Sequence, residues 1–459
     1  MALFAGTVAL MALTTTSRAQ TAGDALIDKL EQKGILTSEE AKDLREENSQ
    51  DFAGNFTNSF DSAFSKKTGM PDWVTDYKLS GDFRGRFEDF TSDNPNFVDR
   101  IRFRYRLRAG LTVDMKDNLQ VGFRLGTGDP VTGFGTQTGN PLSNNSSFQD
   151  NGTKKFVYID TAYGKWTPLS GGDWTLSTIF GKMDNPFQFT PMVFDSDLTP
   201  EGGAAQGSYK INDSHSISFV GAAFILDEEK ASSQDPFLYG GQMVWNAKWS
   251  PKWTSSLGAG AFNIVNDKML TTANVPYVNQ GNTRTAGGTL VKDYNPLIAD
   301  ASVTYTLETF PFYNGAFPVR LAAEYMENPG ASGNNRGYWG GVTFGKSGKK
   351  QTWDLLYRYE YLEADAWYDQ LVDDDNGAYY QTAPTGAPLG SAFSGTSYGW
   401  FGGTNIKGHL VKFNYSITDS LTFSMTCFIN DLINPGLNAP LGEPQSHAIH
   451  AFADLMWKF

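Results

Sequence analysis

The chain has 459 residues and a net charge of −13, with 19% charged residues, 14% aromatic residues and 48 glycines. This charge argues against nucleic acid as a partner, because binding phosphate groups requires the opposite sign. Beyond the N-terminus no run approaches the roughly 18 apolar residues of a transmembrane helix, which excludes a helical membrane protein. A single cysteine, Cys427, excludes an internal disulfide.

The N-terminus predicts an export signal followed by a small helical segment. An apolar run, residues 2–13, precedes the small-x-small triplet Ser17-Arg18-Ala19, which places cleavage after residue 19. The basic residue that usually precedes such a run is missing, so either the true start lies upstream or the run is not a signal. Residues 20–70 are expected to form a periplasmic helical segment and linker, either a solvated hairpin or a part that forms trimers or binds the cell wall.

From residue 71 to residue 459 the sequence alternates apolar and polar residues, as the strands of a transmembrane β-barrel do. The clearest example is residues 100–111, in which five arginines occupy every second position and apolar residues lie between them. A helix would spread these arginines around its circumference, and only a period of two separates them onto one face.

About sixteen such segments are present, an even number that is typical of bacterial barrels. The strands are centred near Tyr77, Ile101, Val121, Ile159, Leu176, Ala205, Phe219, Met243, Leu257, Val303, Leu321, Val342, Tyr357, Val411, Phe423 and Leu455. The connections alternate between short ones, such as 116–118, 212–214, 250–252 and 418–420, and long ones, such as 129–155, 184–201, 263–295 and 362–403. Short periplasmic turns and long external loops predict an all-β fold, a closed antiparallel transmembrane barrel. Two periplasmic connections, near Pro168 and Pro311, are longer than this pattern favours.

The last strand carries a specific signal. Apolar residues share one face and end at the chain terminus: Ile449, Ala451, Ala453, Leu455, Trp457 and Phe459. A terminal aromatic after such a strand resembles the signal by which outer-membrane barrels are recognised by the barrel assembly machinery. The alternative is an edge strand that happens to end in Phe.

Several segments resemble the bacterial "putative porin" family, which is related in style to general-diffusion and phosphate-selective porins. The resemblance rests on the leader, the helical stretch 26–47, the arginine ladder and the segments 122–128, 181–187 and 194–202. It covers most of the chain. It implies a water-filled barrel in the outer membrane, commonly trimeric and without a cofactor, through which small polar solutes diffuse. Outer-membrane lipid and lipopolysaccharide are the surroundings expected for it.

The predicted site is the inner wall of the pore. Three successive strands contribute arginines in one phase: Arg84, Arg86, Arg100, Arg102, Arg104, Arg106, Arg108 and Arg124. An arginine that faces lipid near the midplane costs ~2–4 kcal/mol, so these side chains are expected to face water. Lys182 is also counted among the residues that line the pore or its constriction.

An acidic loop is expected opposite this wall. Asp184, Asp195, Asp197 and Glu201 lie in or beside the third external loop, which in general porins folds inward and narrows the channel. Acids facing arginines across the narrow zone would create a transverse field that filters ions. The alternative is a solvated loop tip. The other loop acids, Asp227, Glu228, Glu229, Glu363, Asp365, Asp369 and Asp373–Asp375, are interpreted as solvated groups, with bound divalent cations or lipopolysaccharide counter-ions as the alternative. The aromatic residues Tyr379, Tyr380, Tyr398, Trp400 and Phe401 are assigned to loop packing or to the interfacial girdle, with sugar stacking as the alternative.

Enzyme motifs are weak. Residues 395–399 match G-x-S-x-G, but this motif has a meaning only between a strand and a helix. The four histidines show no metalloprotease spacing, and His447 and His450 are expected on opposite faces of a strand. The chain is therefore predicted not to be an enzyme. An outer-membrane phospholipase or protease barrel and a secreted β-rich carbohydrate-binding protein are the rival interpretations.

Overall fold

A computed structural model describes residues 71–93, 99–131, 138–277, 280–285, 287–381, 398–435 and 447–459. The predicted signal peptide, residues 1–19, and the predicted helical segment and linker, residues 20–70, lie outside the described residues. Contacts within the chain divide it into residues 1–74 and 75–459, and the second unit holds nearly all of the described residues. No helix among the described residues is long and apolar enough to cross a membrane.

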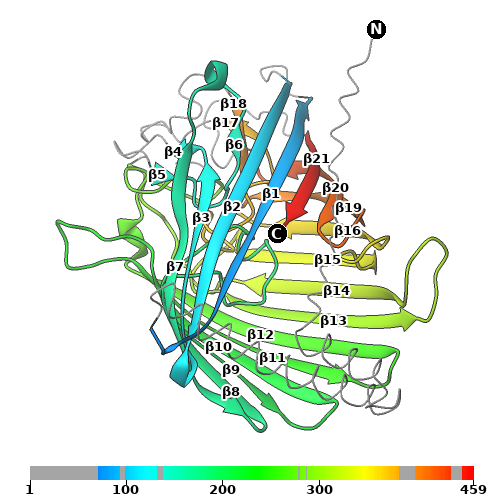
Figure 1. The fold of residues 1–459 in the computed structure, drawn as a ribbon. Helices are drawn as coiled ribbons and strands as arrows, with labels where there is room; N and C mark the ends of the chain where they lie inside the picture. The colour runs from blue at the N-terminus through cyan, green and yellow to red at the C-terminus, as the bar shows by residue number, and fades with distance from the viewer. Residues whose placement is uncertain are drawn as a thin grey trace, which may run out of the picture. The chain divides into compact units, whose positions relative to one another are not determined.

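Sixteen long strands of the described residues form one antiparallel sheet that closes on itself (Figure 1). They are β1 (Val74–Ser92), β2 (Arg100–Met115), β3 (Leu119–Gly128), β7 (Phe156–Gly171), β8 (Trp174–Lys182), β9 (Glu201–Lys210), β10 (His215–Ile225), β11 (Phe237–Lys248), β12 (Trp253–Val265), β13 (Leu297–Leu307), β14 (Phe317–Glu327), β15 (Arg336–Gly345), β16 (Trp353–Leu362), β19 (Ile406–Ser416), β20 (Leu421–Leu432) and β21 (Ala448–Lys458). Each pairs with the next, and β21 pairs with β1 from Asp82↔Lys458 to Ser92↔Ala448. Each of the sixteen predicted centres lies in its own strand, so the predicted closed barrel is confirmed.

The remaining elements are short and lie in the connections. They are β4 (Pro130–Val131), β5 (Thr138–Gly139), β6 (Ser146–Ser147), β17 (Gly377–Gln381) and β18 (Tyr398–Gly402), with the 3-10 turns η1 (Lys116–Asn118), η2 (Asp150–Gly152) and η3 (Asp267–Met269). The strand β6 pairs with β2, and β17 pairs with β18.

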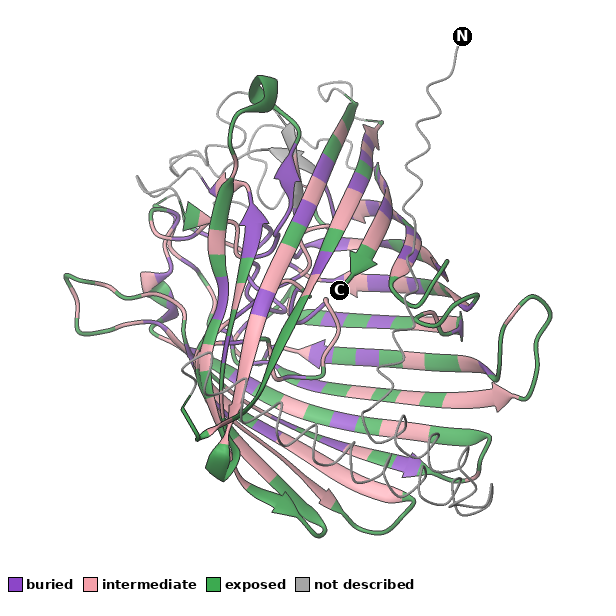
Figure 2. Cartoon of the chain, in the orientation of Figure 1, coloured by how far each residue is buried: buried purple, intermediate pink, exposed green. Residues whose placement is uncertain are grey.

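Side chains alternate along the strands between the outer surface and the interior, which Figure 2 shows as bands of exposed and buried residues. In β2, Ile101 and Phe103 are 63% and 54% exposed, whereas Arg104 and Arg106 are buried. Exposed apolar side chains suit a barrel whose outer surface meets lipid, because lipid and not water surrounds them. The period of two therefore fixes which residues face inward.

Connections alternate in length as the sequence predicts over most of the barrel, but the connections 308–316 and 346–352 are about as long as the external connection 328–335 between them. The connection near Pro168 is short, because β7 continues through this proline to Gly171 and turns at Gly172, whose φ is +67°. A register shift between Trp166 and Leu169 accommodates the proline, as a bulge does when a residue lacks the N–H of the ladder. The connection near Pro311, residues 308–316, is long, as expected.

The chain terminus completes the barrel. The N–H of Gly81 donates to the carbonyl of Phe459 at 2.9 Å, and the N–H of Phe459 donates to the carbonyl of Gly81 at 3.1 Å. The Phe459 side chain is 60% exposed. These bonds satisfy backbone groups that would otherwise be unpaired at the sheet edge.

The assignment of inner and outer faces predicts the effect of a charge placed on each. Ala301→Arg, on the exposed face of β13, should lower the free energy of unfolding by ~2–4 kcal/mol, whereas Ser302→Arg, one residue on and facing the interior, should change it by less than about 1 kcal/mol. Denaturant unfolding in lipid vesicles measures both. Equal losses for the two variants would contradict the assignment.

Candidate functional site

Seven arginines of three adjacent strands face the barrel interior and form what we call the basic wall. They are Arg84 and Arg86 of β1, Arg102, Arg104, Arg106 and Arg108 of β2, and Arg124 of β3. All seven are buried or half-buried, in contrast to the apolar residues between them. Arg100, at the first position of β2, is exposed.

The wall carries its own acids, which the sequence analysis missed. The carboxylate of Asp82 in β1 forms ion pairs with the guanidinium groups of Arg106, at 2.9 Å, and Arg108, at 2.8 Å. The carboxylate of Asp454 in β21 forms an ion pair with Arg86 at 2.8 Å. Glu88 pairs with Arg102, and Asp160 pairs with Arg124. The alternation contained this information, because Asp82 and Glu88 share the parity of Arg84 and Arg86 in β1.

His450 completes this network. It is buried, and its Nε2 lies 2.9 Å from Glu88 while its Nδ1 lies 2.9 Å from the carbonyl of Asp375. His447 instead lies 3.4 Å from Asp431. The two histidines thus lie apart, as the strand geometry predicted.

Loop 3, residues 183–200, crosses the interior from the basic wall to the opposite side of the barrel. On the wall side, Asp197 forms ion pairs with Arg106 at 3.0 Å and with Arg108 at 3.4 Å. Asp184 forms an ion pair with Arg124 at 2.6 Å. On the far side, two further bonds anchor the loop. The Oγ1 of Thr190 donates to Glu324 of β14 at 2.5 Å, and the N–H of Gln188 donates to Gln242 of β11 at 2.7 Å.

Besides Arg100, three of the predicted site residues are not brought to the basic wall. Asp195 turns to loop 7, residues 363–405, where its N–H donates to the carbonyl of Leu371 at 2.7 Å. Lys182 and Glu201 lie opposite each other on β8 and β9 and pair at 3.1 Å. They share the parity of Phe180, which is 77% exposed, and so belong to the outer face.

The described parts of loop 7 and of loop 5, residues 266–296, also fold into the barrel, which the sequence analysis did not predict. Trp367 of loop 7 is fully buried, and its Nε1 donates to the carbonyl of Val193 in loop 3 at 2.8 Å. Tyr294 of loop 5 is equally buried. An apolar core of the three loops and the inner faces of several strands results, including Met192, Phe194, Phe224, Leu238, Phe262, Ile298 and Leu371.

The interpretation of all loop acids as solvated is wrong for Asp365 and Asp369, which are about 1% exposed or less. Asp365 accepts hydrogen bonds from the N–H and hydroxyl of Thr283 and from the hydroxyl of Tyr294. Asp369 accepts from the N–H of Asn282 at 3.1 Å. A buried carboxylate requires such partners, and here they join loop 7 to loop 5.

The acids at the contact between loop 3 and loop 7 divide into two groups by the direction in which their pKa is shifted. Burial alone would raise the pKa of Asp197 and of Asp375, but the arginines outweigh it and lower the pKa of both; Arg86 lies 3.1 Å from Asp375. Asp195, Asp373 and Asp374 have carboxylate oxygens within 4.8 Å of one another. Burial and repulsion from neighbouring carboxylates raise the pKa of Asp195 and Asp374. Burial and repulsion from Asp375 raise the pKa of Asp373 to about 7.

These pKa values predict how the contact between loop 3 and loop 7 depends on pH. A pKa near 7 in the docked loops exceeds the ordinary carboxyl value of about 4, so the docked loops bind a proton that undocked loops release. Docking should therefore be firmest near pH 4, weaken as the pH rises from about 4 to about 7, and change little above pH 7. Hydrogen exchange at the amides of Asp195 and Asp373, corrected for intrinsic rates, should show less protection at pH 8 than at pH 5.

The variant Asp373→Asn with Asp374→Asn should flatten this dependence, whereas Glu228→Gln, on another external loop, should leave it unchanged. Unaltered pH dependence in the double variant would show that these carboxylates do not control docking.

The comparisons with known proteins agree with the barrel. A family model described as "putative porin" matches residues 95–286. The high-pH structure of Pseudomonas putida OprB is similar with a TM-score of 0.50 at 12% identity, covering 83% of this chain and 94% of that one. Its low-pH structure has a TM-score of 0.43 at 10% identity, covering 86% and 96%.

A variant of the porin of Rh. blastica has a TM-score of 0.40 at 9% identity, covering 84% of this chain and all of that one. No curated protein sequence matches the chain. The family match confirms the resemblance to porins that the sequence shows, and the OprB likeness shows the fold alone. With the closed barrel, this match places the protein in the outer membrane.

Proposed function

Since the chain resembles the "putative porin" family and forms an outer-membrane barrel, we propose that it is a channel for passive diffusion of small polar or charged solutes. The observation that carries this proposal is loop 3, which is tied to the basic wall by Asp197 and to the opposite side by Glu324. A barrel of this strand number encloses an aqueous lumen, and a loop across it sets the narrowest zone.

The narrow zone is proposed to select among ions through the charges that meet there. Asp184 and Asp197 of loop 3 and Asp375 of loop 7 lie against the basic wall. Because Asp197 lies in direct ion-pair contact with Arg106 and Arg108, much of the wall's positive charge is balanced locally. We therefore propose that the transverse field expected from the sequence is strongest beside these ion pairs, where loop 3 and the basic wall are no longer in contact.

No enzymatic role is proposed. Residues 395–397 of the G-x-S-x-G match lie outside the described residues, and the buried Glu88 and His450 serve the arginine network. A homotrimer, contact with lipopolysaccharide, and recognition of Phe459 by the barrel assembly machinery also remain predictions. The exposed side chain of Phe459 supports the last of these, because it is available to a partner.

Planar bilayers test the channel directly. Purified, folded protein should give stepwise, ohmic and mostly open conductance, because a barrel of this strand number is wide enough to hold an aqueous channel. A mock preparation from cells without the protein serves as the control. Folded protein that inserts and conducts nothing would contradict the proposed function.

Reversal potentials in a salt gradient test the charges of the narrow zone. Asp197→Asn leaves arginine charge unbalanced and should shift the permeability ratio several-fold towards anions, and Arg108→Gln should shift it towards cations. Lys252→Gln, an exposed residue paired with Glu308 at a short turn, is the matched control and should change nothing. Unchanged potentials in both site variants would exclude these residues from the narrow zone.

A further inference from the structure

Across the lumen from the basic wall, two exposed cations face the interior. They are Lys248 of β11 and Arg320 of β14, and neither forms a direct ion pair in the described part of the chain. Arg320 interacts at a distance with the carboxylate of Asp300. Both share the parity of buried residues on their own strands, Val244 and Glu324. Their charge is therefore available to a solute, in contrast to that of Arg86 or Arg106.

Strand register joins these two cations by a row of hydroxyls. Lys248 lies opposite Thr254, Thr254 opposite Thr304, and Thr304 opposite Arg320. At about 4.8 Å per strand, the backbones of the two cations lie about 14 Å apart, and their long side chains can both reach a solute lying over the threonines.

A second row runs beside the first, one inward position further along each strand. It consists of Ser216, Asn246, Ser256 and Ser302, each opposite the next. The hydroxyls of Ser256 and Ser302 lie 2.8 Å apart. We call the two rows together the hydroxyl tract.

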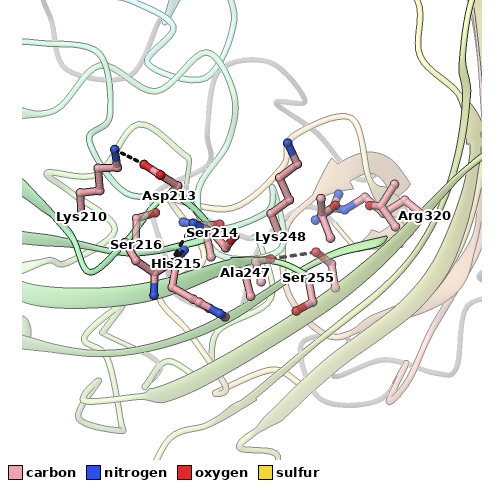
Figure 3. A pocket seen from close by; sticks show the side chains of 15 residues that line it. Lys210, Asp213, Ser214, His215, Ser216, Ala247, Lys248, Ser255 and Arg320 are labelled. Atoms are coloured by element: carbon pink, nitrogen blue, oxygen red, sulfur yellow. Dashed lines mark hydrogen bonds and ion pairs between the residues drawn. The ribbon is translucent and has the colours of Figure 1, made fainter. Parts of the chain in front are cut away.

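The hydroxyl tract lines a cavity of about 560 Å³, shown in Figure 3. This volume lies within the range of about 300–1,000 Å³ that small-molecule sites occupy. In the next row inward, Asp300 lies opposite Gly258, and its Oδ2 is shielded from solvent without a hydrogen-bond partner in the described residues. The Oγ of Ser218 is likewise shielded from solvent and has no hydrogen-bond partner in the described residues.

The tract lies next to the far anchor of loop 3. Asp300 is opposite Glu324, the residue that accepts the hydroxyl of Thr190. The tract lies between this anchor and the short turns, so a solute that has passed loop 3 meets the hydroxyl tract before it leaves the barrel. The tract thus lies on the path that the proposed function requires.

We propose that the hydroxyl tract is a transit binding site for polyhydroxylated anions, with sugar acids as the representative class. This inference rests on the proposed channel function. Arg320 can bind a carboxylate through two parallel N–H groups, Lys248 adds a second charge, and serine and threonine hydroxyls both donate to and accept from the hydroxyls of the solute. The cavity is open and the cations are exposed, which suits weak binding that still allows release, as conduction requires.

Current block in planar bilayers tests the site, with gluconate as the probe and with glucose and acetate as comparisons. Gluconate should reduce the single-channel current at concentrations at which glucose, which lacks the charge, and acetate, which lacks the hydroxyl chain, do not. Lys248→Gln with Arg320→Gln should raise the half-blocking concentration of gluconate about tenfold, the loss expected when a charge-assisted hydrogen bond is removed.

Lys210→Gln is the matched control, because Lys210 lines the same cavity but pairs with Asp213 at 2.6 Å; it should leave the block unchanged. Equal block by acetate or by glucose, or unchanged block in the double variant, would overturn the proposal. Both cations are exposed, so the double variant should fold and conduct. Absence of any channel in the wild type would instead contradict the proposed function, which keeps the two failures distinct.

Discussion

Pairing of every backbone N–H and C=O within a closed sheet is the constraint on which the rest of the structure depends. Lipid offers these groups no hydrogen-bond partner, so a sheet that spans a membrane must have no open edge. The pairing of β21 with β1, extended by the bonds between Gly81 and Phe459, removes that edge. Once the cylinder is closed, alternation along each strand separates a lipid-facing side from an interior.

The interior then has to accommodate its charges. Seven arginines on three neighbouring strands would repel one another strongly in a confined space. The structure distributes acids around them from three sources: the strands themselves, loop 3 and loop 7, represented by Asp82, Asp197 and Asp375. Removing one partner from such a buried pair is costly because it leaves the other charge uncompensated. The folding of the loops into the barrel and the placement of the arginines are therefore coupled.

On the opposite side of the lumen, the cations are not held in direct ion pairs as the arginines of the basic wall are. Lys248 and Arg320 lie among hydroxyls and form no direct ion pair within the described residues, although Asp300 lies within electrostatic reach of Arg320. The lumen is consequently asymmetric, with balanced charge at the narrow zone and available charge beside the short turns. On this view the ladder of arginines, the most conspicuous feature of the sequence, mainly holds the loops, and the less conspicuous tract meets the solute.

Local alternation was sufficient to predict the barrel, because a period of two identifies a strand and its faces without knowledge of its neighbours. It also located Arg106 and Arg108 on the inner face, where Asp197 of loop 3 meets them. It did not reveal the partners Asp454 and Asp160, since these depend on which strands become neighbours on closure. The burial of Trp367 and Asp365 was equally hidden, because a loop that packs inside a barrel has no periodicity of its own. Asp195, Lys182 and Glu201 were assigned by position in the sequence, and the fold directs their side chains elsewhere.

Spin-label accessibility along β12 and β13 tests the central claim of a lipid-facing outside and a wet inside most directly. Single labels at positions 256, 257, 302 and 303 would be introduced by cysteine substitution into a Cys427→Ser background, in lipid vesicles. Labels replacing Ser256 and Ser302 should collide with a water-soluble nickel chelate, and labels replacing Leu257 and Val303 should collide with oxygen dissolved in the lipid. Labels at Ser256 and Ser302 that are shielded from both reagents would indicate a dry core and would contradict the account.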